Sequence, residues 1–180
     1  SAEELLREVA ELVKRVDEDL RRLLEEVRAS NEEVIRRLEE ILKRIEEENR
    51  KVVEELRRGG VSEDLVRESK RLVDESRRVI EKLVKESADS VERTRETVDR
   101  LREELKRLVE EIAKMVKGGS SEETVKRLLD ELRELLERLK RTIEELLKRN
   151  RDLLADLLMS CAQESEENRK LLKAARDTAT

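Results

Sequence analysis

Apolar residues recur along this chain at a fixed interval of 18 positions, called one repeat, as in Leu5, Leu23 and Ile41. An α-helix has about 3.6 residues per turn, so this interval is about five complete turns. Residues spaced in this way stay on one side of a straight helix. About three positions are apolar for every two turns, which is typical of a helix in a bundle core rather than of a two-stranded coiled coil.

Two glycine pairs, at residues 59–60 and 118–119, interrupt the pattern and contain every glycine of the chain. Glycine after a periodic run favours the left-handed backbone conformation that ends a helix. After the second pair, we expect Ser120 to cap the next helix and to form a capping box with Glu123. The pattern predicts three helices, over about residues 2–58, 62–117 and 121–177.

The three predicted helices are nearly equal in length and are joined by short loops. Short loops place consecutive helices side by side and antiparallel. The sequence therefore predicts an all-α fold, an up-down-up antiparallel three-helix bundle with long, nearly straight helices. We expect one domain over residues 1–180.

The composition agrees with long helices and narrows the possible partners. Charged residues make up 49% of the chain and aromatic residues are absent, but 36% of residues are hydrophobic and placed periodically, which argues against disorder. The 42 basic and 47 acidic residues are closely mixed, with no basic block that would follow a nucleic-acid backbone. No apolar run reaches the ~18 residues that a membrane span needs, and no signal-peptide pattern opens the chain. We therefore expect no nucleic-acid partner and no membrane insertion.

Small polar residues interrupt the apolar positions at the same interval and fall at two common levels of the predicted bundle. A buried amide without a partner costs about 1–3 kcal/mol, whereas grouped polar residues can satisfy one another. Neither level contains a charged or strong metal-binding residue, so we favour a structural role in fixing register over a ligand or ion site. The first polar layer comprises Asn31, Ser87, Ser90 and Asn150, and the second comprises Asn49, Ser69, Ser165 and Asn168.

The residues needed for common kinds of catalysis are missing. Without histidine, the chain has no Ser-His or Cys-His pair and no Glu-x-x-His metal motif. Its carboxylates lie mostly one helical turn from Lys or Arg, as on solvated helix faces. The single cysteine, Cys161, cannot form an intrachain disulfide. The sequence predicts no catalytic residue, no metal site and no cofactor.

One stretch, residues 152–166, departs from the regular pattern on the side of the helix that points away from the core. Four uncharged residues stand where charged residues stand one repeat earlier. Three interpretations remain open: a grafted helical recognition peptide, a surface that packs on a further helix or a second copy, and a local change without a role. The four residues, here called the outer face, are Ala155, Met159, Ala162 and Gln163. The residues one repeat earlier are Glu137, Arg141, Glu144 and Glu145.

The periodic repeat, the glycine-pair loops, the layered Asn and Ser residues and the lack of proline and aromatics occur together. In this combination nearly the whole chain resembles de novo designed helical bundles with buried hydrogen-bond networks. Relatives of that family include half-bundles of designed heterodimers and cage-and-latch switches, in which a terminal helix carries a functional peptide.

The resemblance implies a designed structural scaffold without catalytic activity, which needs no partner to fold. The alternative is a designed binding or switch protein that displays a helical recognition peptide around residues 152–166. A protein partner would then bind at that face, or a fourth helix would join the bundle.

Overall fold

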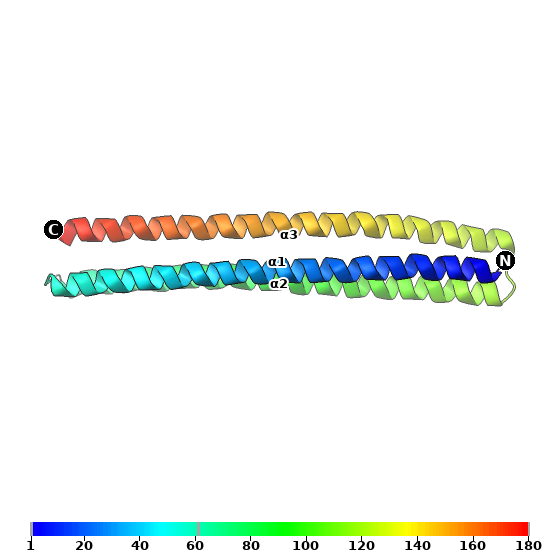
Figure 1. The fold of residues 1–180 in the computed structure, drawn as a ribbon, viewed down its shortest axis with the longest axis horizontal. Helices are drawn as coiled ribbons and strands as arrows, with labels where there is room; N and C mark the ends of the chain where they lie inside the picture. Colours follow the sequence, from blue (N-terminus) through cyan, green and yellow to red (C-terminus); the bar gives the residue numbers. More distant parts are fainter. Residues whose placement is uncertain (1, 61, 180) are drawn as a thin grey trace. The chain divides into compact units, whose positions relative to one another are not determined.

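The structure, a computed structural model, describes residues 2–60 and 62–179. Three long helices pack against each other as a bundle, which confirms the predicted all-α class (Figure 1). Each predicted helix boundary lies close to the observed one. The helices are α1 (Ala2–Arg58), α2 (Glu63–Lys117) and α3 (Glu122–Ala179).

The contacts within the chain group into two compact units. Unit 1 combines Ser1–Ala29 with Val91–Asn150, and unit 2 combines Ser30–Ser90 with Arg151–Thr180. Each unit therefore contains one segment of every helix. That the whole chain forms one domain stays a prediction.

In unit 1, the buried residues show how α1 and α2 run relative to each other. Val9 near the start of α1 packs in one cluster with Ile112 of α2. Further along α1, Leu23 packs in a second cluster with Val98 of α2. Residue numbers rise along α1 while they fall along α2, so these two segments are antiparallel.

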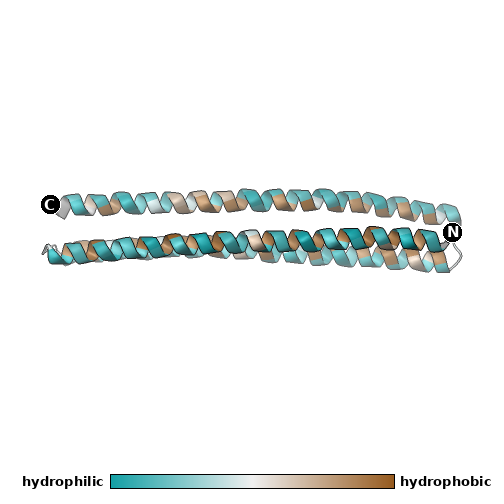
Figure 2. Cartoon of the chain, viewed as in Figure 1, coloured by the Kyte–Doolittle hydropathy of each residue, from teal (hydrophilic) through white to brown (hydrophobic). Residues whose placement is uncertain are grey.

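In unit 2, the core shows the direction of α3. Ile45 of α1 shares a cluster with Cys161 of α3, and further along Leu56 packs with Leu172. The segments of α1 and α3 are therefore parallel. Brown apolar positions alternate with teal polar ones along the visible parts of the helices (Figure 2).

The glycine pairs end α1 and α2 as predicted. At the end of α2, Gly119 has a φ of 73° and its N–H donates to the Val116 carbonyl at 3.3 Å. The Ser120 N–H donates to the Met115 carbonyl at 3.1 Å, which completes a Schellman motif. Gly60 ends α1 with a φ of 69°.

The predicted cap of α3 is wrong by one position. The Ser121 hydroxyl accepts the N–H of Thr124 at 3.3 Å, and the Ser121 carbonyl accepts that of Val125 at 3.1 Å. Ser121 is therefore the N-cap, and the expected capping box between Ser120 and Glu123 does not form. The reason is that Ser120 still belongs to the end of α2, where its N–H closes the Schellman motif.

Candidate functional site

Two of the predicted polar residues form a reciprocal pair in unit 2. Asn49 Nδ2 donates to Asn168 Oδ1 at 3.1 Å, and Asn168 Nδ2 donates to Asn49 Oδ1 at 2.9 Å. Both side chains are buried. Each amide thereby gains one donor and one acceptor from the other, so this pair joins α1 to α3 and serves the packing of the helices.

The two serines predicted for the same layer have other surroundings, and their membership of the layer stays a prediction. Ser69 is buried, but its hydroxyl donates to the Leu65 carbonyl of its own helix at 3.1 Å. Ser165 is half-buried and lines a groove between α1 and α3. Because the Ser69 hydroxyl donates its single hydrogen to the Leu65 carbonyl, it does not donate to the asparagine pair.

In the other predicted layer, Asn31 meets Ser87 through the backbone. Asn31 Nδ2 donates to the Ser87 carbonyl oxygen at 2.8 Å, and both residues are buried. Asn31 Oδ1 and the Ser87 hydroxyl have no hydrogen-bond partner in the described part of the chain. Ser90 is half-buried in unit 2, and Asn150 is buried and belongs to unit 1.

A further polar contact in unit 2 was not predicted. The Ser76 hydroxyl donates to Glu164 Oε1 at 3.0 Å and so links α2 to α3. Glu164 stands one repeat after Leu146, which packs against the core of unit 1. This position, one repeat after a core leucine, is the sequence signal that places Glu164 on the inner side of the helix.

Glu164 belongs to a stretch of α3 whose inner side has lost large apolar residues. Ser165 stands one repeat after Leu147, which packs against the core of unit 1. Cys161 likewise takes the position that Ile143 holds one repeat earlier. The helix in this stretch therefore buries less apolar surface than it does one repeat earlier.

Cys161 is completely buried in the core of unit 2. Burial raises the pKa of its thiol, and the nearby carboxylate of Glu164 raises it further. A thiolate is the form that attacks electrophiles and binds metals. The raised pKa favours the protonated thiol over the thiolate, and Cys161 packs as a core residue of unit 2.

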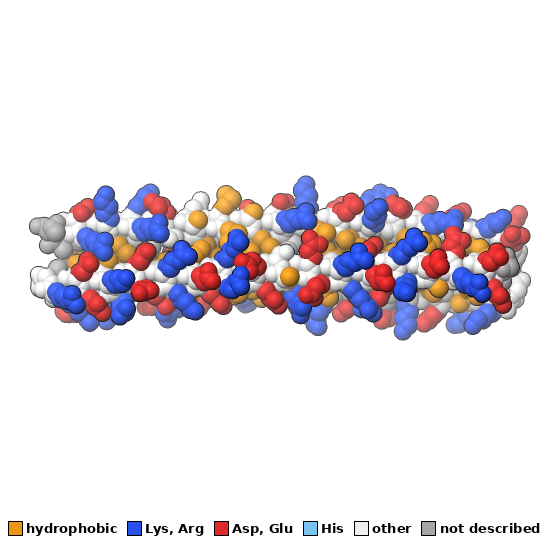
Figure 3. Space-filling view, viewed as in Figure 1, with side chains coloured by type: hydrophobic (Ala, Val, Ile, Leu, Met, Phe, Trp, Pro, Cys, Tyr) orange, Lys and Arg blue, Asp and Glu red, His pale blue; other side chains and the backbone are white. Residues whose placement is uncertain are grey.

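The outer face lies on the surface of α3, as the sequence predicted. Ala155, Met159, Ala162 and Gln163 are all exposed. The Met159 side chain is 62% exposed, the highest value for a large apolar residue in the described part of the chain. Hydrophobic side chains also reach the outer edge of α3 in the space-filling view, between charged ones (Figure 3).

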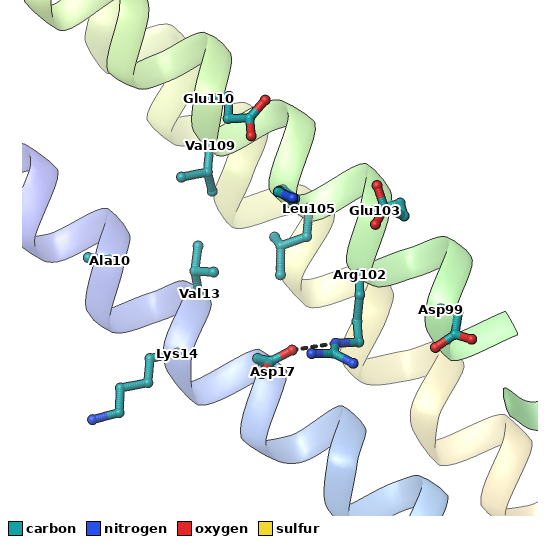
Figure 4. Close-up of a pocket in the computed structure, with 11 residues that line it drawn as sticks. Ala10, Val13, Lys14, Asp17, Asp99, Arg102, Glu103, Leu105, Val109 and Glu110 are labelled. Atoms are coloured by element: carbon teal, nitrogen blue, oxygen red, sulfur yellow. Dashed lines mark hydrogen bonds and ion pairs between the residues drawn. The ribbon is translucent and has the colours of Figure 1, made fainter. Parts of the chain in front are cut away.

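A groove of about 810 Å³ lies between α1 and α2 of unit 1. Val13 and Val109 point toward each other across it, and Asp17 of α1 points toward Arg102 of α2 (Figure 4). Arg102 Nε donates to Asp17 Oδ1 at 2.6 Å, so these two charges satisfy each other. The groove is a surface furrow spanned by an ion pair.

The described residues contain no group of three or more His, Cys, Asp and Glu side chains that is arranged to hold a metal ion. Among the same residues, no helix has an apolar stretch long enough to cross a membrane. The chain matches no protein-family model, no curated protein and no solved structure. The candidate functional sites are the outer face and a groove between α2 and α3 of unit 2, which Leu72, Val79 and Leu171 line.

The asparagine pair should show strong energetic coupling. Replacing Asn49 alone by Leu leaves the Asn168 amide buried without its partner, which should lower the free energy of unfolding by about 1–3 kcal/mol. Replacing both by Leu should recover most of this loss. Urea unfolding of both single variants and the double variant gives the coupling energy. Additive losses would contradict the role of the pair.

Ser165→Leu should stabilise unit 2. A leucine there repeats the packing of Leu147 and covers Ile41 and Ile45 in the groove that Ser165 lines. We expect the free energy of unfolding to rise by roughly 1–2 kcal/mol in urea unfolding. Ser160→Leu, on the exposed side of the same helix, is the control and should give no such gain. An equal effect of both changes would mean that the groove is not underpacked.

Proposed function

We propose that this chain is a de novo designed helical scaffold without catalytic activity. The observation that carries the proposal is the burial of residues that stand one repeat apart. Leu20, Leu38 and Leu56 are all buried, and so are the paired asparagines. The apolar pattern, the helix ends and the buried core therefore all favour the same three-helix structure. Such agreement is what makes a sequence specify a single fold.

The surface chemistry supports a role without catalysis. Exposed carboxylates pair with arginines one turn away, as in Glu25 with Arg28 at 2.8 Å. A hydrogen bond from Arg71 lowers the pKa of the Glu68 carboxyl. General acid–base catalysis needs a pKa near the working pH, and this pairing moves the carboxyl away from neutrality. Such pairs keep the surface charged and hydrated.

A scaffold should tolerate replacement of its outer face. We would exchange Ala155, Met159, Ala162 and Gln163 for the Glu, Arg, Glu and Glu that stand one repeat earlier. Because all four are exposed, the free energy of unfolding should change by less than about 0.5 kcal/mol in chemical denaturation. A loss of several kcal/mol would show that the face contributes to folding, which contradicts the proposal.

We propose as the second candidate that the outer face is a displayed recognition segment. The supporting observation is the high exposure of Met159, on the side of α3 that carries arginine one repeat earlier. The four positions have i, i+4, i+7 and i+8 spacing. A helix that docks in a partner's groove uses anchors at such intervals. In this role the inner side of α3 holds the helix in place while the outer side meets the partner.

The double variant Met159→Glu, Ala162→Lys tests this display role. Binders would be selected against the unmodified chain from a library of helix-binding proteins. Those that recognise the outer face should lose at least about tenfold in affinity for the variant, since a charge replaces an apolar anchor. The matched control is Arg141→Glu, Glu144→Lys, one repeat earlier. Equal affinity for the unmodified chain and the double variant would remove the display role.

A further inference from the structure

A second surface with exposed apolar residues lies between α2 and α3 of unit 2. This α2/α3 groove has a volume of about 380 Å³ and is lined by Leu72, Val79 and Leu171, with polar residues between them. Val79 is 37% exposed and Leu171 is 47% exposed. These are two of the four exposed large apolar residues in the described part of the chain, so the exposure is concentrated in one groove.

The groove is open because polar residues occupy the positions beneath it. The Ser76–Glu164 hydrogen bond links the two helices there, and Asn168 lies beside it. One repeat before Glu164, the residue is a leucine that packs against a core. One repeat before Leu171, Leu153 is half-buried against the core of unit 2. With polar side chains beside it, Leu171 is therefore more exposed than Leu153 is one repeat earlier.

The charges along the groove are unbalanced. The α3 side carries Glu164 and Glu167, and neither has an ion-pair partner among the described residues. Glu164 is half-buried and has only the neutral hydroxyl of Ser76 as its described hydrogen-bond donor. On the α2 side, Glu75 is paired with Arg71 at 2.6 Å, and Arg78 is the one basic residue of the lining, against the three acidic residues Glu75, Glu164 and Glu167. A partly desolvated carboxylate is stabilised by a cation, so the α3 side favours a basic ligand.

We propose that the α2/α3 groove binds an amphipathic α-helix of another protein. The apolar stripe of that helix covers Val79 and Leu171. Lys or Arg residues on one edge lie along α3 and pair with Glu164 and Glu167. The net charge of −5 makes a second copy of this chain a less suitable occupant than a basic helix. The proposal does not depend on the outer face.

Two synthetic helical peptides of about 20 residues test the proposal with the full chain, since shorter helices are marginal in water. Both have the same leucine stripe, and one flank carries Lys and Arg in the first peptide and Glu in the second. By fluorescence anisotropy at low salt, the basic peptide should bind at least about tenfold more tightly. The difference should shrink in high salt. Equal binding of the two peptides, or no binding of either, would overturn the proposal.

Three single variants locate the site. Leu171→Glu should abolish binding of the basic peptide and leave the fold intact, as checked by circular dichroism. Glu164→Gln retains an oxygen that accepts the Ser76 hydrogen bond, but it should weaken binding several-fold and reduce the preference for the basic peptide. Met159→Glu is the control and should have no effect.

Two results would show that another surface binds the peptide or that another molecule occupies the groove. Loss of peptide binding in Met159→Glu but not in Leu171→Glu would overturn the groove proposal and favour the outer face. Light scattering that shows a dimer of the unmodified chain and a monomer of Leu171→Glu would make a second copy the occupant, which also overturns it. Failure of the display experiment alone leaves the groove result unaffected, so the two proposals fail separately.

Discussion

The fold depends on one constraint: the apolar side chains that recur once per repeat must remain on the inner side of a helix. Because one repeat makes about five full turns, such side chains do not drift around a straight helix. Leu20, Leu38 and Leu56 illustrate this, since all three are buried. The packing of the helices and the burial of the polar pairs both follow from keeping that side inward.

The same constraint buries any polar residue that takes an apolar position. Asn49 and Asn168 satisfy each other, but Asn31 uses only its amide nitrogen and leaves Oδ1 without a described partner. Sequence spacing predicted that Asn31 and Ser87 meet. It did not predict that the Ser87 carbonyl rather than its hydroxyl accepts the bond, because that choice depends on side-chain rotamers and on shifts of a fraction of an ångström.

The spacing of the apolar residues and the short loops were sufficient to predict the three helices and the antiparallel arrangement of consecutive helices. The cap of α3 was misplaced because both Ser120 and Ser121 suit an N-cap, and only the hydrogen bond from Ser120 to α2 decides between them. Glu164 was missed for a different reason. An acidic residue in this chain normally indicates surface, and only its position one repeat after Leu146 indicates the inner side. The exposure of the outer face follows from the sequence, because its four residues stand one repeat after charged residues.

The two candidate surfaces arise in opposite ways. At the outer face, apolar Met159 stands where the repeat has arginine, so apolar surface lies on the exposed side of the helix. At the α2/α3 groove, polar Ser76 and Glu164 occupy inner positions, so apolar packing was lost and Leu171 became exposed. In the two proposals, stability and binding are therefore independent at the outer face but compete at the groove. Apolar residues that strengthened the contact between α2 and α3 would also cover the surface proposed to receive a partner helix.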